Sequence, residues 1–223
     1  MADQAIYTSL DRRGKSGYHL VARSSGVSEG EATAVARWCP SHDGLIVDVA
    51  NHVSVNFHAL PGGRFALGRT CRGRPEYSGR GGWQIYTHVL VLDLETLRRS
   101  GFRPFRIYRD ALALGYPHYR NDPPATLPRL PLLSLSPGPD APAAARGPSA
   151  AIIDSVVNQI NAGQEVVVTY GGDRGALAES LLERVEPGKV LTTSFATSLH
   201  PSTVRPFRLH IVPPSANSAA LSV

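Results

Sequence analysis

The residues best suited to chemistry lie in a glycine-rich stretch that runs into an apolar segment. Residues 78–93 open with Ser78 and Gly79-Arg80-Gly81-Gly82 and continue into an apolar run with one imidazole, His88, at its middle. Glycine lets a backbone approach a ligand closely, and the planar arginine guanidinium can hold a carboxylate or a phosphate with two parallel hydrogen bonds. We predict that Arg80 binds a partner or an anion, beside the alternative of a plain surface arginine.

His88 has two interpretations. A histidine in the middle of an apolar strand is most often a core residue whose ring nitrogens are hydrogen bonded, and this interpretation is favoured. The alternative is a proton acceptor or ligand contact beside Arg80. A small enzyme could use His88 with Arg80 or Cys71, but no Gly-x-Ser-x-Gly motif and no triad spacing supports one. We therefore assign no catalytic residue.

Basic residues are concentrated in the middle of the chain. The formal net charge is +5, and residues 64–109 contain ten arginines but three acidic residues. Such a segment favours an acidic protein surface, a nucleotide or a nucleic acid as partner, with a solvated arginine face as the alternative. The candidate partner- or anion-binding residues are Arg64, Arg69, Arg80 and His88.

A second, weaker motif joins a strand to a helix at Gly171-Gly172-Asp173-Arg174. Main-chain N–H groups at such a helix start can bind phosphate, so Gly171, Gly172 and Arg174 are weak nucleotide-binding candidates. The motif lacks the Gly-Lys-Ser/Thr of a Walker A loop. A tight connection in which Asp173 caps the helix explains the same residues.

The remaining composition predicts no cofactor and no membrane segment. The chain has two cysteines, Cys39 and Cys71, which we interpret as free and buried thiols. Cys39 and His42 have a ligand-like spacing, but a second close pair, as in structural zinc sites, is missing, so we predict no metal. No apolar run approaches the roughly 20 residues of a membrane span, and no signal peptide is recognisable. We expect the cytoplasm as location.

The pattern along the chain predicts an α+β fold. We expect a mixed, largely antiparallel sheet with flanking helices in residues 4–120, a Pro-rich linker in 121–148 and a smaller α/β portion in 149–213, which could pack with the first as one domain. Eight of the eighteen prolines lie in residues 121–149, where proline disfavours regular structure. Within this stretch, residues 127–135 are apolar enough to pack on the body in extended form.

Several elements are expected from local signals. Residues 4–10 and 18–24 form a strand pair, and Ser28 with Glu31 makes a capping box for a helix over 28–38. Residues 52–60 alternate, with a polar side that we expect to face solvent. Residues 83–93 are apolar on both sides and belong inside the sheet. The other expected strands are 64–70, 104–108, 165–170 (a buried type), 190–199 and 207–212, and the other helices are 94–100, 149–161 and 173–185.

The order of these elements resembles a known family, the N-terminal domain, type 2, of GTPase-associated protein 1. The similar segments are Tyr7-Thr8-Ser9 with Gly17-Tyr18 and Arg23-Ser24, then Phe57-x-x-Leu60-Pro61-x-Gly63-Arg64, then Gly79-Arg80-Gly81-Gly82 through His88-Val89-Leu90-Val91-Leu92, and near the end residues 191–199 and 205–209. The resemblance covers most of residues 4–213.

The resemblance implies a context and not a reaction. Relatives are bacterial proteins encoded beside small GTPases, in systems linked to signalling or biological conflict. It implies a non-enzymatic adaptor or regulatory protein whose partner is a small GTPase or another protein of the same system. A nucleic-acid-binding module is the first alternative and the small enzyme is the second.

Overall fold

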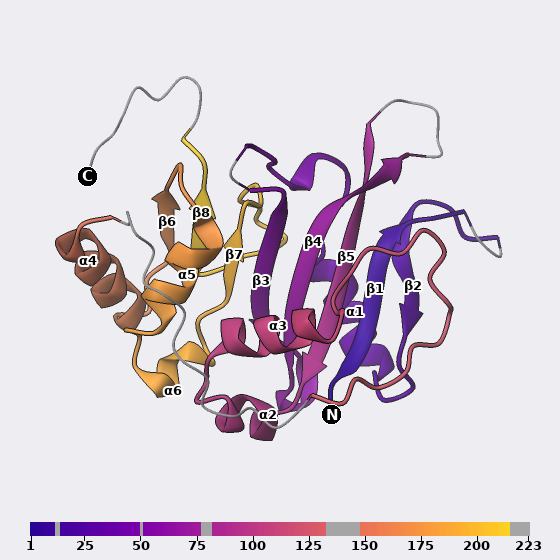
Figure 1. The fold of residues 1–223 in the computed structure, drawn as a ribbon, viewed down its shortest axis with the longest axis horizontal. Helices are drawn as coiled ribbons and strands as arrows, with labels where there is room; N and C mark the ends of the chain where they lie inside the picture. The colour runs from indigo at the N-terminus through magenta and orange to yellow at the C-terminus, as the bar shows by residue number, and fades with distance from the viewer. Residues whose placement is uncertain (12–13, 50, 77–81, 133–147, 215–223) are drawn as a thin grey trace.

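The computed structural model describes residues 1–11, 14–49, 51–76, 82–132 and 148–214. One eight-stranded sheet runs through the molecule in the order β2-β1-β5-β4-β3-β7-β8-β6 (Figure 1). The strands are β1 Asp3–Ser9, β2 Tyr18–Arg23, β3 Val53–Ala59, β4 Phe65–Pro75, β5 Trp83–Leu92, β6 Val166–Thr169, β7 Phe195–Thr197 and β8 Leu209–Val212. The helices are α1 Glu29–Trp38, α2 Leu94–Arg99, α3 Pro104–Ala113, α4 Ala150–Asn161, α5 Arg174–Leu182 and α6 Pro187–Val190.

The strand directions confirm the expected α+β class with a mixed, largely antiparallel sheet. The pairs β1–β2, β1–β5, β4–β5, β3–β4 and β3–β7 are antiparallel, whereas β7–β8 and β6–β8 are parallel. The sheet therefore continues from the strands before the Pro-rich stretch to those after it, through the β3–β7 pair.

The strongest local signals are confirmed. β5 is paired on both sides, and nine of its ten residues are buried, as an apolar run without alternation predicts. The capping box of α1 is present: Ser28 accepts from the Glu31 N–H, and the Glu31 carboxylate accepts from the Ser28 N–H. Leu127 and Leu130 are buried, and Leu130 bridges to Ala2, so the described part of residues 127–135 packs in extended form.

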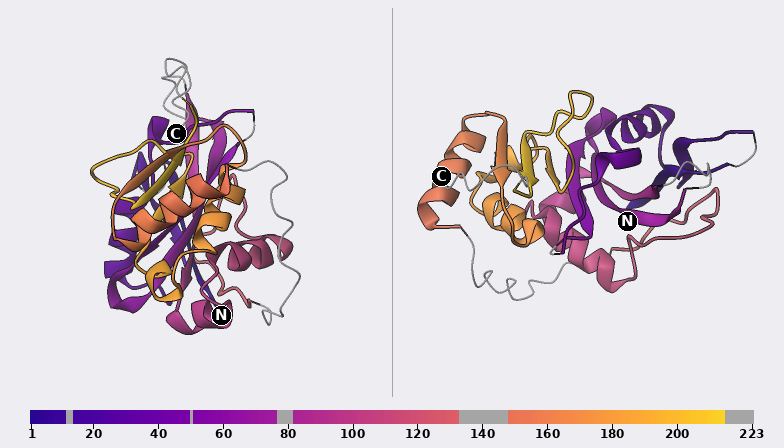
Figure 2. Two further views of the ribbon diagram at one scale, coloured as in Figure 1. Left: turned by 90° about the vertical axis from the view of Figure 1, so that its left-hand side faces the viewer. Right: turned by 90° about the horizontal axis from the view of Figure 1, so that it is seen from above.

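Helices cover both faces of the sheet (Figure 2). α1 packs on one face against Ala5, Val89 and Val91. On the other face, α3 and α5 contribute Ile107 and Leu177 to the largest apolar cluster, together with Phe57 and Leu90. The sheet is thus the middle layer, and the candidate site lies on the face that carries α3.

The prediction of a strand over residues 104–108 is wrong, because these residues begin helix α3. Pro104 occupies the first turn of the helix, where its missing N–H costs nothing. Phe105, Ile107, Tyr108 and Ala111 then fall on one buried face. This spacing is helical, and five residues were too few to reveal it.

Two predictions after residue 148 also need correction. The expected strand over 190–199 is divided: Val190 ends the short helix α6, and only Phe195–Thr197 is a strand. The expected buried strand near residue 165 is β6, an edge strand on which Val167 is 59% exposed. Apolar composition alone does not distinguish an edge from the interior of a sheet.

The polar side of β3 is buried, contrary to the expectation that it faces solvent. Ser54, Asn56 and His58 are at most 4% exposed. The His58 ring stacks on Trp38 at the end of α1, with ring centroids 4.4 Å apart, and Asn56 Nδ2 lies 3.4 Å from Thr70 Oγ1. Alternation therefore marked two faces correctly, but the second face is covered by chain segments that are distant in sequence.

In the part of the chain that the structure describes, we find no helix with the length and apolar character needed to cross a bilayer.

Candidate functional site

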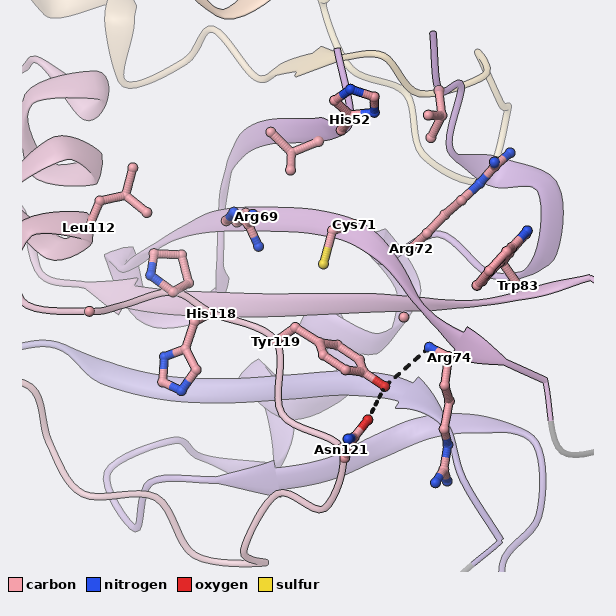
Figure 3. A pocket seen from close by; sticks show the side chains of 15 residues that line it. His52, Arg69, Cys71, Arg72, Arg74, Trp83, Leu112, His118, Tyr119 and Asn121 are labelled. Carbon is pink, nitrogen blue, oxygen red and sulfur yellow. Dashed lines mark hydrogen bonds between the residues drawn. The ribbon is translucent and has the colours of Figure 1, made fainter. Parts of the chain in front are cut away.

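The candidate site is a pocket at the outer end of β4, beside the start of β5 and the C-terminal end of α3 (Figure 3). Its volume of about 920 Å³ lies in the range of about 300–1,000 Å³ typical of small-molecule sites. The lining residues are Val47, His52, Val53, Arg69, Cys71, Arg72, Gly73, Arg74, Trp83, Leu112, Gly115, Pro117, His118, Tyr119 and Asn121. We call it the arginine pocket.

The arginine pocket is cationic. Arg69, Arg72 and Arg74 all come from β4, and His52 and His118 add imidazoles. No aspartate or glutamate is among the described residues that line it. The guanidinium groups spread around the pocket: Figure 3 shows Arg72 on the side of Trp83, Arg74 on the side of Asn121 and Arg69 nearer to α3. The arrangement suits an extended anion better than a single small one.

Local packing fixes the end of β4. A Cβ atom on Gly73 would lie 2.6 Å from Tyr119 Cε2, so only glycine allows this close approach. The Tyr119 hydroxyl accepts the Arg74 N–H at 3.2 Å and donates to Asn121 Oδ1 at 2.8 Å. The register of β4 and β5 shifts between Arg72 and Pro75, and such an irregularity redirects side chains near a strand end.

Arg69 is the half-buried member of the arginine pocket. Burial raises the pKa values of the Cys71 thiol and the Tyr108 hydroxyl, and the neighbouring Arg69 guanidinium opposes both shifts. Arg69 therefore lies between these two groups, whereas Arg72 and Arg74 are exposed. Packing therefore positions the Arg69 side chain, whereas the Arg72 and Arg74 side chains can adjust to a ligand.

His88 lies opposite Arg69 across the β4–β5 pair, but beneath the arginine pocket. Its ring is 1% exposed. Nε2 lies 2.9 Å from Gln4 Oε1, and the His118 N–H donates to Nδ1 at 3.3 Å. Burial lowers the pKa of His88 to about 3, so the ring is neutral at pH 7. This is the geometry of a core histidine.

Arg64 lies away from the arginine pocket, between two buried carboxylates. Its Nη2 lies 2.6 Å from Asp3 Oδ2, and its Nη1 lies 3.3 Å from Glu31 Oε1. Arg64 also donates to the main-chain oxygens of Gly26 and Val91. Its guanidinium thus links β1, α1 and β5.

The other singled-out residues that the structure describes are not brought to this pocket. Arg80 lies outside the described residues. Gly171 and Gly172 precede α5, where Asp173 caps the helix as expected by accepting the Ala176 N–H. Arg174 is fully buried and donates to Asp48 Oδ2 at 2.6 Å and to Ser198 Oγ at 2.7 Å. The Arg174 hydrogen bond lowers the pKa of Asp48.

Sequence reasoning did not single out most of this site. Arg72 and Arg74 were counted only as part of the basic segment, and Trp83, His118 and Tyr119 were not selected. One usable signal was Arg72-Gly73-Arg74, which resembles the Gly-Arg-Gly spacing that drew attention to Arg80. Cys39 and Cys71 are free and buried, as expected. Among the described residues, no three histidine, cysteine or acidic side chains could hold a metal ion.

Comparison with known proteins yields one informative match. The family model described as GTPase-associated protein 1, N-terminal domain type 2, matches residues 1–133. The resemblance of residues 191–199 and 205–209 lies beyond this match and stays a prediction. Searches of curated proteins and of solved structures gave no match. The match includes every described residue that lines the arginine pocket. Because it covers more than half of the chain, the protein belongs to the type 2 N-terminal domain family of GTPase-associated protein 1.

Proposed function

We propose that the protein is a non-enzymatic adaptor or regulatory protein of a bacterial GTPase-associated system, acting in the cytoplasm. Its arginine pocket recognises an acidic surface of a small GTPase, or of another protein of the system, or a nucleotide that this partner carries. The observation that supports this most is the pocket itself, with three arginines and no carboxylate among its described lining residues. Uncompensated arginines attract and orient an anionic partner.

The exposure of these arginines favours binding over a structural role. Arg72 and Arg74 are exposed and belong to no ion pair among those found in the described residues. Several other arginines of the basic segment have carboxylate partners: Arg98 pairs with Glu95, Arg103 with Glu183 and Arg109 with Glu179. The end of β4 therefore carries two neighbouring exposed arginines without a carboxylate partner among the described residues.

The geometry gives little support to the enzyme alternative. Both ring nitrogens of His88 have partners inside the core, and burial raises the pKa of Cys71, which disfavours a thiolate nucleophile. Arg80 lies outside the described residues. The site therefore agrees better with recognition of a partner or ligand than with catalysis of a reaction.

A binding experiment tests the proposal with the purified GTPase encoded beside this gene. The double variant Arg72→Ala and Arg74→Ala should weaken association at least tenfold at low salt, and the loss should shrink at high salt, since screening removes exposed electrostatic attraction. Arg99→Ala is the matched control, because Arg99 is an exposed arginine of the same segment on α2, at the opposite end of β5 (Figure 1). Equal affinities of the wild type and the double variant at both salt concentrations would contradict the proposal.

A further inference from the structure

The arginine pocket combines its cations with an exposed aromatic ring. Trp83 lines the pocket and is 51% exposed, and Leu112 at the other end is 42% exposed. Aromatic and aliphatic side chains, with a few polar groups that fix orientation, are the usual lining of small-molecule sites. Figure 3 shows the Trp83 indole on the same side of the pocket as the Arg72 side chain. A ligand of this pocket needs both a planar apolar part and a negatively charged part.

The arginine pocket is long enough for an extended small molecule. Arg69 on β4 lies directly opposite His88 on β5, and Trp83 lies five residues from His88 along β5. At about 3.3 Å per residue, the backbones of Trp83 and His88 are roughly 17 Å apart. Trp83 therefore marks one end, and Arg69 with His118 lies toward the other, nearer to α3 (Figure 3). An aromatic group and a chain of anionic groups can be bound at separate positions along this length.

We propose that the arginine pocket binds a nucleoside polyphosphate. The base stacks on the Trp83 indole, and the phosphates lie against the guanidinium groups of Arg69 and Arg72, with Arg74 closing from the Asn121 side. Base stacking on an exposed aromatic ring is favourable for every base, and arginine binds phosphate oxygens with paired hydrogen bonds. This inference rests on the proposed function in that it uses the same pocket. It does not need a partner protein, because the ligand binds the isolated chain.

Two other ligand classes fit less well. Extended peptides commonly bind by adding a strand to an open sheet edge, but β4 lies between β3 and β5, and β5 lies between β1 and β4. A single nucleic-acid strand stacks successive bases on several aromatic rings. Here the Tyr119 hydroxyl is held by hydrogen bonds with the Arg74 main-chain N–H and with Asn121. Of the tryptophan and tyrosine rings among the described lining residues, Trp83 is the exposed one.

Calorimetric titration of the purified chain with GTP, ATP, inorganic triphosphate and guanosine tests the proposal. We expect at least one nucleotide to bind at least about tenfold more tightly than inorganic triphosphate. This difference corresponds to the contribution of one stacked base. Trp83→Ala should reduce nucleotide affinity to that of triphosphate and leave triphosphate binding unchanged. Arg72→Ala with Arg74→Ala should weaken both ligands.

Two controls guard against general effects of substitution. Val204→Ala removes another exposed apolar side chain, and Arg99→Ala removes another exposed arginine; neither should change any titration. Circular dichroism of each variant verifies that the fold is retained, and titration of Arg69→Gln adds an independent test of the pocket.

Three results would overturn the proposal. The first is that no nucleotide binds with a dissociation constant below about 1 mM. The second is that Trp83→Ala affects nucleotide and triphosphate equally. The third is that a short single-stranded oligonucleotide competes out every mononucleotide. If nucleotides fail to bind while the arginine double variant still loses the GTPase, the adaptor proposal stands alone; if nucleotides bind and the GTPase does not, only the nucleotide site stands.

Discussion

Two arginines of the same basic segment, Arg64 and Arg72, are used in different ways. Arg64 is largely enclosed and bridges Asp3 and Glu31, whose side chains are 3% and 6% exposed. Arg72 is exposed at the far end of the same strand region and lines the arginine pocket. The comparison shows that the charge of a segment divides into a part that holds the fold together and a part that remains available to a ligand.

The difference depends on which carboxylates approach each arginine. Arg64 follows the turn before β4, where the start of β1 and the first turn of α1 bring Asp3 and Glu31 to it. No acidic residue reaches the described part of the pocket lining at the other end of β4. Position along one strand therefore separates an arginine with buried carboxylate partners from an exposed one without a carboxylate partner among the described residues.

The largest expected effect comes from removing the structural arginine. Arg64→Ala should lower the free energy of unfolding by about 2 kcal/mol, because two buried carboxylates lose a cation. The loss is moderated because Arg129 Nε remains 3.2 Å from Asp3 Oδ1 and Glu31 still accepts from Ser28. Urea unfolding of the wild type and the variant at pH 7 measures this change in the free energy of unfolding. A change no larger than that of Arg72→Ala would remove the distinction between the two arginines.

Two buried histidines, His88 beneath the arginine pocket and His58 against Trp38 of α1, should make stability depend on pH. Burial lowers the pKa of His88 to about 3 and that of His58 to about 4, so the unfolded chain binds protons below about pH 6.5 that the folded chain does not. The free energy of unfolding should therefore fall as the pH decreases from 6.5 to 4.5. His88→Gln should reduce this slope by up to about 1.4 kcal/mol per pH unit.

Urea unfolding at several pH values measures these slopes. His200→Gln, at an exposed position, serves as the control and should keep the wild-type slope. If the His88 variant also keeps that slope, His88 is protonated in the folded protein and belongs with the accessible groups of the arginine pocket.

A smaller effect is expected at the boundary between core and pocket. Gly73→Ala places a Cβ atom 2.6 Å from Tyr119 Cε2, and relief of such overpacking costs about 1 kcal/mol or somewhat more. Because Tyr119 holds the Arg74 N–H, the same change should weaken anion binding. Unfolding and inorganic triphosphate titration together measure both effects. Unchanged binding despite a loss of stability would show that Tyr119 does not position Arg74.

The smallest effect on stability is expected at the available arginines. Arg72→Ala and Arg74→Ala should each change the free energy of unfolding by less than about 0.5 kcal/mol, as exposed substitutions usually do, while ligand or partner binding is weakened. Parallel unfolding and binding measurements on each single variant test this separation. Destabilisation comparable to that of Arg64→Ala would place these arginines in the structural group.

Local sequence signals predicted most of the sheet and the first helix. The apolar run ending at Leu92 predicted an interior strand, and Ser28 with Glu31 predicted the start of α1, because both signals depend on neighbours within a few residues. The helix at Pro104 and the covered polar face of β3 were missed. The helix was missed because five residues are too few to reveal a helical spacing. The face of β3 was missed because the segments that cover it are distant in the chain.

The candidate site was predicted only in outline. The sequence indicated a basic segment and named Arg69, but it could not show that Trp83, His118 and Tyr119 lie around the end of β4. It also could not distinguish Arg64 and Arg174, which have carboxylate partners in the fold, from arginines without them.

The amino-acid sequence by itself determined the α+β class and the concentration of arginine in one segment, because periodicity, capping and composition are local properties. The order of its similar segments also indicated the family. The tertiary structure alone decided which arginines remain available. Electrostatic compensation depends on distances of a few ångströms between residues that can be more than a hundred positions apart, as for Asp48 and Arg174. Only folding brings such pairs together, and it leaves the end of β4 without an acidic neighbour among the described pocket residues.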